Sequence, residues 1–254
     1  MSYTGVVRPL LNCYPFNKSK DHPKILEIGI DKGQSLFPIV QNLSSRFPKF
    51  LYYGVDVLVR DQMFQSLCQF HDVSIHPMDE MSGRDVIISE QNSLDWLQKN
   101  QKSQTHFDIV FLDGDHNYYT VSHELRLLQN VIHPQSIIVC DDFNGRHAFK
   151  DSFYGERDEY KDVKSATRKI ETGPNKNVFE EAAGVKPAVL NFVESNKNWS
   201  GFQWDDLEPC ILYRNDVWEE LETPNQSYGN AKELRDVIFN FRLKNNSVKF
   251  SEFW

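Results

Sequence analysis

The chain has 254 residues, 40% of them hydrophobic, and a formal net charge of −8 at pH 7. This apolar content is enough for the core of one large α/β domain, whereas the acidic balance argues against binding to the phosphates of nucleic acid. The four cysteines form no CxxC pair, so the sequence indicates reduced thiols rather than a zinc site or a disulfide framework. No apolar run reaches the roughly 18 residues of a membrane span, and the polar start lacks the pattern of a secretory signal, so we expect a cytoplasmic protein.

The first predicted elements form a nucleotide-binding βαβ unit. A strand over 24–28 runs into the loop from Gly29 to Gly33, and apolar spacing predicts a helix from about Ser35 to Arg46. The second strand covers 50–55 and has Asp56 at its end. A strand, a glycine-bearing loop, a helix and a second strand with a terminal carboxylate suit a ligand that contains a ribose.

The next segment has weaker signals. A helix is expected from about 60 to 70, followed by strand-like pieces at 73–76 and 86–89 whose order in the sheet stays open. Another helix opens at the sequence Ser93-Leu94-Asp95-Trp96-Leu97, with Asn92 or Ser93 as its N-cap.

The most informative stretch is a strand, helix, strand unit near the middle of the chain. Two apolar, β-branched blocks at 108–112 and 136–140 are typical of strands that are buried on both faces, and helix-spaced apolar residues lie between them. Asp113 and Asp141 follow the two blocks and are 28 residues apart. A right-handed crossover of this length brings the carboxyl ends of both strands to one edge of the sheet, where ligands bind in open α/β sheets.

The remaining chain completes the predicted fold. Polar residues 144–183 form a long, partly helical excursion of the kind that serves as a lid or a binding loop. A helix over 185–195, a strand over 210–214 and an amphipathic helix from about Ala231 to Leu243 follow. We therefore expect a Rossmann-like, doubly wound α/β fold with a mostly parallel sheet of about seven strands and helices on both faces. The expected parts are an irregular lead-in at 1–23, one domain at 24–215 that includes the excursion at 144–184, and a helical extension at 216–254.

The glycine loop alone is a weak signal. Asp31 stands where the second glycine of a GxGxxG fingerprint would be, which disfavours an oxidoreductase with a nicotinamide cofactor. Asp56 strengthens the case for a ligand because a carboxylate at this strand end can accept hydrogen bonds from ribose hydroxyls. The simpler alternative, a solvated aspartate at a strand end, stays open.

The carboxylates of the central unit allow two interpretations. The turn Asp113-Gly114-Asp115-His116 and the pair Asp141-Asp142 are explained either as turn and cap residues or as a site for a hard cation. Clustered carboxylates repel one another unless they are neutralised, and Mg²⁺ prefers such oxygen ligands. In the second case, Asp115 or His116 is close enough to take a proton from a substrate.

These motifs together resemble the class I S-adenosylmethionine-dependent methyltransferases and, within them, the small-molecule O-methyltransferases related to macrocin-type sugar methyltransferases. The resemblance covers roughly Lys24 to Tyr213. The stretches that carry it are ILEIGIDKGQS, YYGVDV, EQNSLDWL, LDGDH, CDD and GVKPAVLNFVESNKNW.

The resemblance implies a role for each motif residue. Residues that would bind the cofactor S-adenosylmethionine are Glu27, Gly29 and Gly33 at its amino-acid end, Asp56 at its ribose, Asn92 and Ser93 near its adenine, and Asp113. The implied Mg²⁺ ligands are Asp113, Asp141 and Asp142, and the implied base is Asp115. This chain departs from the pattern at two places, since Asn92 replaces a common aspartate and His116 is a second candidate for the base.

The expected function is methyl transfer from S-adenosylmethionine to a hydroxyl of a small polyhydroxylated, sugar-like acceptor, assisted by Mg²⁺. Two alternatives stay open, a methyltransferase that acts on a macromolecule and a noncatalytic module that binds the cofactor. The expected partner is a small-molecule acceptor, with no nucleic acid and no membrane, and a homodimer stays open. We expect the excursion to determine specificity, with Arg146, His147 and Tyr154 as candidates by their location alone.

Overall fold

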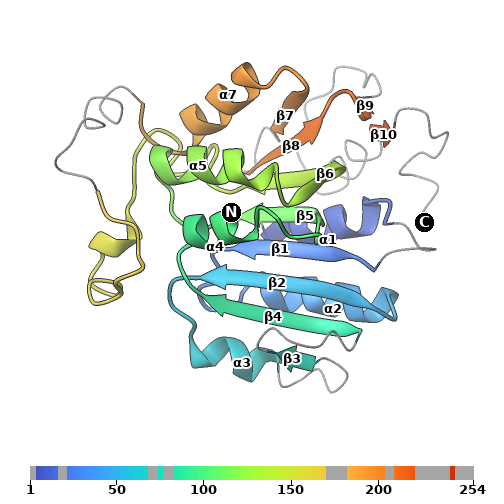
Figure 1. Cartoon of the computed structure of the whole chain (residues 1–254), viewed down its shortest axis with the longest axis horizontal. Helices are drawn as coiled ribbons and strands as arrows, with labels where there is room; N and C mark the ends of the chain where they lie inside the picture. The colour runs from blue at the N-terminus through green and yellow to red at the C-terminus, as the bar shows by residue number, and fades with distance from the viewer. Residues whose placement is uncertain are drawn as a thin grey trace.

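The computed structural model describes residues 4–16, 22–67, 74–76, 83–169, 182–203, 209–220 and 241–243. Within these ranges, an eight-stranded sheet forms the centre of the molecule (Figure 1). Its strands, in spatial order, are β3 (Ser74–His76), β4 (Arg84–Glu90), β2 (Phe50–Asp56), β1 (Lys24–Ile28), β5 (Phe107–Leu112), β6 (Ile132–Cys140), β8 (Cys210–Arg214) and β7 (Trp199–Gln203). The strands from β3 to β6 pair in parallel, and β8 is antiparallel to both of its neighbours. The predicted doubly wound, mostly parallel sheet is confirmed.

The strand order changes direction at β1, which pairs with β2 on one side and β5 on the other. A crevice forms at such a switch point, outside the carboxyl ends of the strands, because the loops leaving the two strands run to opposite sides. In Figure 1 the arrowheads of β1, β2, β4 and β5 point to one edge of the sheet, and the yellow segment beyond residue 144 lies past this edge. The aspartates that follow β5 and β6 therefore reach the edge that the sequence predicted.

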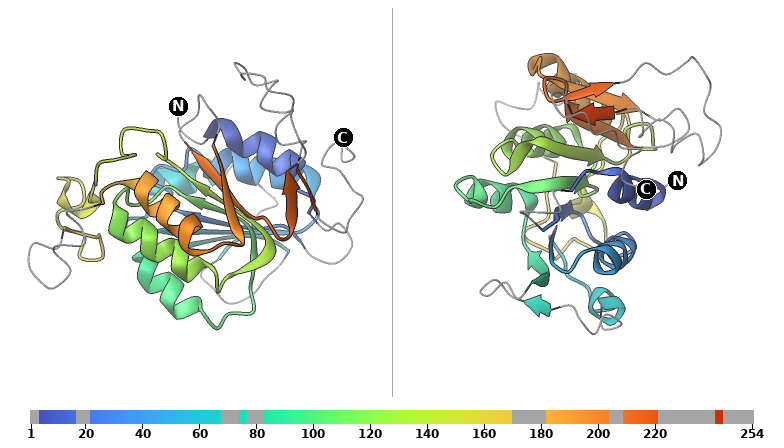
Figure 2. Two further views of the ribbon diagram at one scale, coloured as in Figure 1. Left: turned by 90° about the horizontal axis from the view of Figure 1, so that it is seen from above. Right: turned by 90° about the vertical axis from the view of Figure 1, so that its right-hand side faces the viewer.

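Among the described residues, three helices pack on each face of the sheet (Figure 2). On one face lie α1 (Thr4–Cys13), α2 (Leu36–Arg46) and α3 (Asp61–Leu67), and on the other lie α4 (Ser93–Asn100), α5 (Tyr118–Leu128) and α7 (Val185–Ser195). Alternate strand residues enter the two cores, as when Ile25 packs into the first and Leu26 and Ile28 into the second. Among the described helices, none combines the length and the apolar character that crossing a bilayer requires.

The expected irregular lead-in is wrong for residues 4–13, which form α1. Val6, Val7, Leu10 and Leu11 recur at helix spacing and are fully or almost fully buried in the first core. Pro9 lies inside this helix. Its missing N–H weakens the helix locally, and packing of the apolar face keeps the segment helical.

Two strands differ from the sequence-based expectation. β6 begins at Ile132 instead of residue 136, and the register with β5 shifts between Phe107 and Ile109. This irregularity admits the exposed Pro134 into the strand, because a proline is tolerated where the ladder is interrupted. β7 was not predicted at all.

The end of the chain also differs. Phe241–Leu243, expected as the last turn of a helix, is strand β10 and pairs antiparallel with β9 (Trp218–Glu220). The rest of that expected helix lies outside the described residues. In the excursion, the described part contains one 3-10 helix, Tyr154–Glu156, and is otherwise built of turns and extended pieces.

Candidate functional site

A cavity of about 580 Å³ lies at the carboxyl edge of the sheet, and we call it the carboxyl-edge cavity. Its walls come from the loop after β1, the end of β2, the start of α4, the turn after β5 and the residues after β6. Residues 144–169, which we call the covering segment, complete the lining. The cavity therefore brings together the loops that the sequence indicated as separate candidate sites.

The loop after β1 is held tightly between its neighbours. Gly29 has a φ of +87° and donates its N–H to the carbonyl of Val55 at 2.9 Å. A Cβ at Gly29 would overlap the backbone carbonyl of Asp113 and lie 2.5 Å from the backbone nitrogen of Gly114. Only glycine fits this position, because it tolerates positive φ and has no side chain. Gly29 lines the cavity, whereas Gly33 lies outside its lining.

Glu27 lies beneath this loop and not in the cavity wall. Its side chain is fully buried, and its carboxylate accepts hydrogen bonds from the hydroxyls of Ser35 and Tyr52. Burial and the neighbouring Glu27 carboxylate raise the pKa of Tyr52 well above its ordinary value, so the phenol keeps its proton. Glu27 thus supports the loop from below, and sequence reasoning missed both of its partners.

Asp56 lines the cavity and also fixes the shape of the β1 loop. One carboxylate oxygen accepts the backbone N–H groups of Ile30 and Asp31 at 2.7 and 2.9 Å, and the other accepts from Leu58 at 3.0 Å. Burial raises the pKa of Asp56, and these three N–H groups partly offset that rise. The carboxylate has about four acceptor positions, so it can still accept from a ligand.

Asn92 caps α4 as predicted, and it also holds the covering segment. Its Oδ1 accepts from the backbone nitrogen of Leu94 at 2.9 Å. Its Nδ2 donates to the carbonyl of Ser165 at 2.8 Å and to Oγ1 of Thr167 at 3.1 Å. Asn92 and Ser93 both line the cavity. The contact across 73 to 75 residues of sequence has no local signal that could have revealed it.

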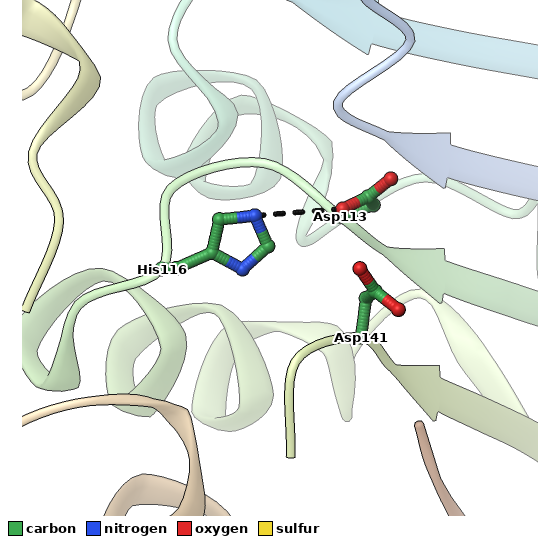
Figure 3. A group of neighbouring side chains, drawn as sticks. All are labelled: Asp113, His116 and Asp141. Atoms are coloured by element: carbon green, nitrogen blue, oxygen red, sulfur yellow. Dashed lines mark ion pairs between the residues drawn. The ribbon is translucent and has the colours of Figure 1, made fainter. Parts of the chain in front are cut away.

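Asp113, His116 and Asp141 form a group of potential metal ligands (Figure 3). One ligand atom from each residue lies within 4.8 Å of the other two. Nε2 of His116 is 3.5 Å from Oδ1 of Asp113, and its Nδ1 is 3.5 Å from Oδ2 of Asp142. The expected third carboxylate ligand, Asp142, lies outside this group and faces the other ring nitrogen of His116. The sequence anticipated Asp113 and Asp141 as ligands, but it assigned His116 only to proton transfer.

The chemistry of this group fits a divalent cation. Burial and repulsion from the nearby Asp141 raise the pKa of Asp113 well above its ordinary value. Burial, with the nearby His147, Arg157 and Arg146, lowers the pKa of His116 to about 3, so the imidazole is neutral near pH 7. The ionised forms of the two carboxyl groups repel each other, and a neutral imidazole lies beside them. A divalent cation would stabilise this set of oxygen and nitrogen donors.

The turn after β5 also anchors the covering segment. Oδ1 of Asp115 accepts the backbone N–H of Tyr154 at 2.8 Å, and the carbonyl of His116 accepts the N–H of Ser152 at 3.0 Å. Burial raises the pKa of Asp115 to about 6, although its contacts with Tyr154, Thr167 and Arg157 oppose that rise. Asp115 lines the cavity but is partly occupied by this structural contact.

Arg60 fastens the covering segment at a third point. Its Nε lies 3.0 Å from Oδ1 of Asp31, and its NH2 lies 3.1 Å from Oε2 of Glu159 and donates to the hydroxyl of Tyr160 at 3.2 Å. Sequence reasoning did not identify Arg60 because its partners come from two distant segments. Asn92, the turn after β5 and Arg60 together hold the covering segment across the carboxyl-edge cavity.

The three specificity candidates in the excursion occupy different places. Arg146 and Tyr154 line the cavity. His147 is buried behind His116, with the two rings stacked at a centroid distance of 5.3 Å and an interplanar angle of 17°. His147 therefore supports the ligand group and does not face the cavity.

Residues 26–143 match a protein-family model described as a methyltransferase domain. This stretch of the chain is similar to methyltransferase domains. The matched region runs from β1 to just beyond β6 and contains the candidate site residues from Glu27 to Asp142. The match agrees with the recognition of a methyltransferase from the sequence and with the expectation of an enzyme.

Three methyltransferases are among the solved structures to which this chain is similar. Human methyltransferase-like protein 13 in complex with SAH is 13% identical, with a TM-score of 0.48, and the match covers 94% of this chain and 89% of that one. The TDP-rhamnose 3'-O-methyltransferase CalS11 of calicheamicin biosynthesis is 12% identical, with a TM-score of 0.48 and coverage of 82% and 78%. The mycinamycin pathway enzyme MycE, in complex with Mg, SAH and mycinamycin VI, is 14% identical, with a TM-score of 0.45 and coverage of 82% and 48%. A comparison with curated protein sequences gave no match.

Proposed function

We propose that this methyltransferase transfers the methyl group of S-adenosylmethionine to a hydroxyl oxygen of a small polyhydroxylated, sugar-like acceptor with the help of a divalent cation, Mg²⁺ in the first instance. One observation carries the proposal. The ligand group of Asp113, His116 and Asp141 shares a single cavity with the β1 loop and Asp56. A methyl donor and an acceptor hydroxyl placed beside these residues would therefore meet in one cavity.

The cofactor would occupy the part of the cavity beside β1, β2 and α4. Gly29 permits close approach of a ligand to the backbone, Asp56 keeps an acceptor position for ribose hydroxyls, and Asn92 and Ser93 close the adenine side. This assignment leaves the part of the cavity beside β5 and β6 for the acceptor.

Asp113 and Asp141 would hold the cation. When bound, a divalent cation binds hydroxyl oxygens and lowers their pKa. The two carboxyl groups also lie at the ends of adjacent parallel strands, whose backbones are fixed by the sheet. Their separation is therefore set before any ligand arrives, which favours precise placement of the acceptor.

Because Asp113 and Asp141 alone would hold the cation, Nε2 of His116 would stay uncoordinated and would accept the proton of the acceptor hydroxyl. Its Nδ1 faces the carboxylate of Asp142, which favours a proton on Nδ1 and leaves the lone pair on Nε2, the nitrogen next to Asp113. Asp115, the base implied by the family resemblance, is engaged by the backbone of Tyr154 and mainly holds the covering segment.

The proposed reaction balances without any further reactant. The acceptor oxygen forms a bond to the methyl carbon as the carbon–sulfur bond breaks, and the electron pair of that bond stays on sulfur. The hydroxyl proton passes to Nε2 of His116. The enzyme mainly supplies alignment and proton removal, because the sulfonium is already an activated methyl donor.

The test combines metal binding with turnover. We expect Mg²⁺ to bind to protein saturated with S-adenosylhomocysteine (SAH), and Asp113→Asn to weaken this binding while SAH affinity is retained. With a panel of sugars and catechols, formation of SAH should require the cation and stop with EDTA. Asp95→Asn is the matched control, because Asp95 is exposed on α4 and lies outside the cavity lining. Turnover that is undiminished in EDTA and in Asp113→Asn would refute the metal assignment.

A further inference from the structure

Two arginines of the covering segment stand on the acceptor side of the cavity. Among the described residues, three cationic side chains line the cavity, namely Lys32, Arg146 and Arg157. Lys32 belongs to the β1 loop, on the proposed cofactor side. Arg146 follows the aspartate pair after β6, and Arg157 follows the 3-10 helix that packs on the turn after β5. The two arginines thus lie beside the proposed ligand group.

Arg157 is held in place before any ligand binds. Its guanidinium lies 3.7 Å from the ring centroid of Tyr154, and its NH2 donates to Oγ of Ser152 at 2.8 Å. The chain around it has little freedom, because Gly155 donates its N–H to the carbonyl of Thr167 and a Cβ at Gly155 would lie 2.6 Å from that oxygen. A guanidinium has five N–H donors, so this fixed group has donors left for a ligand.

Arg146 is exposed, and it forms no hydrogen bond or ion pair with any other residue in the described ranges. This is unexpected for a guanidinium in a cavity whose walls include Asp113, Asp115, Asp141 and Asp142. Arg146 is nevertheless close, since its charge contributes to lowering the pKa of His116. A cation that stays unpaired beside several carboxylates is available to an incoming anion.

We propose that Arg146 and Arg157 form an anion subsite, and that the acceptor carries a carboxylate or phosphate group near the hydroxyl that is methylated. This inference rests on the proposed function. Guanidinium groups bind carboxylates and phosphates through paired N–H donors. The acidic walls repel an anionic acceptor, so the two arginines are the groups that would admit it and orient it against the ligand group.

The carboxylate of the cofactor is the competing occupant of this subsite. The amino-acid end of the cofactor is assigned to the β1 loop, where Lys32 is the nearby cation of the lining. Arg157 instead contacts residues 152 and 154, which are bound to the turn after β5. The position of the arginines beside β5 and β6 favours the acceptor.

The first experiment titrates inorganic phosphate into SAH-saturated protein. We expect the wild type and Arg126→Gln to bind phosphate, and Arg146→Gln and Arg157→Gln to bind it about tenfold more weakly or worse, the typical effect of losing one charge-assisted hydrogen bond. Arg126 is a matched control, because it is exposed on α5 and outside the cavity lining. Arg157→Lys keeps the charge, so this variant should fold. It lacks the paired N–H donors, so it should recover only part of the affinity for phosphate.

The second experiment identifies the source of the anion by comparing glucose, glucose 6-phosphate and glucuronate, which differ at one carbon. The wild type should prefer one of the two anions over glucose, and the arginine variants should lose this preference at unchanged SAH affinity. Absence of phosphate binding by the wild type would overturn the proposed subsite. Loss of SAH affinity in the arginine variants would also overturn it, because the arginines would then bind the cofactor and not the acceptor. Failure of the wild type to bind SAH would contradict the proposed function itself, so the two failures are distinguishable.

Discussion

Replacing Gly29 with alanine should damage both stability and catalysis, because this residue separates the proposed cofactor and metal halves of the cavity. Its φ of +87° costs an L-residue roughly 1–2 kcal/mol. The added Cβ would overlap the backbone of Asp113 and lie 2.5 Å from the nitrogen of Gly114. Both atoms belong to the main chain, so the β1 loop and the turn after β5 must move apart by about 1 Å to restore ordinary contacts.

Overpacking of this kind costs about 1–3 kcal/mol. Added to the cost of about 1–2 kcal/mol for the positive φ, it should lower the free energy of unfolding by about 2–5 kcal/mol. The same displacement moves the cofactor loop away from Asp113, and turnover should fall by about a hundredfold. Urea denaturation and single-turnover kinetics measure the two effects. Gly5→Ala is the control, since no heavy atom lies within 4 Å of a Cβ there, and alanine should stabilise α1 by about 0.5–1 kcal/mol. Wild-type stability and turnover in Gly29→Ala would refute the reasoning.

Three further predictions concern other side chains around the cavity. Burial raises the pKa of Glu124 to about 8 from an ordinary 4.5, because the folded protein disfavours the charged carboxylate. The free energy of unfolding should therefore be highest below pH 4.5, where the group is protonated in both states, and should fall as the pH rises, by about 3 kcal/mol at pH 7. Glu124→Gln should remove this pH dependence of the denaturation midpoint, and parallel pH profiles of the two proteins would argue against it. Asn92→Ala should cost about 1 kcal/mol as a lost N-cap and expose the covering segment to limited proteolysis, whereas an unchanged cleavage rate would exclude the tether. Asp142→Asn should lower kcat at unchanged SAH affinity, and full activity would rule out its role toward His116.

The sequence was sufficient for the centre of the sheet and for the edge that carries the site. Apolar runs predicted β1, β2 and β5, since strands buried on both faces need apolar side chains along most of their length. Parallel pairing then placed Asp113 and Asp141 at the same edge, because the crossover rule leaves no other arrangement. The N-cap at Asn92 followed from a local rule as well.

Features that depend on distant contacts were beyond sequence reasoning. Helix α1 was missed because Pro9 obscured an apolar face whose stability comes from packing on the rest of the domain. The place of His116 beside Asp141 depends on how the turn after β5 folds, which the residue spacing does not determine. The contacts of Arg60 and Asn92 with the covering segment join residues 73 to 100 positions apart.

Calorimetric titration of SAH into the purified protein tests the central claim, that the carboxyl-edge cavity is the site of S-adenosylmethionine. The wild type and the exposed-site control Asp95→Asn should bind SAH with the same affinity. Asp56→Asn should bind at least about tenfold more weakly, since a neutral amide would replace the charged acceptor for the ribose hydroxyls. Absence of SAH binding by the wild type, or equal binding by all three proteins, would contradict this account of the site.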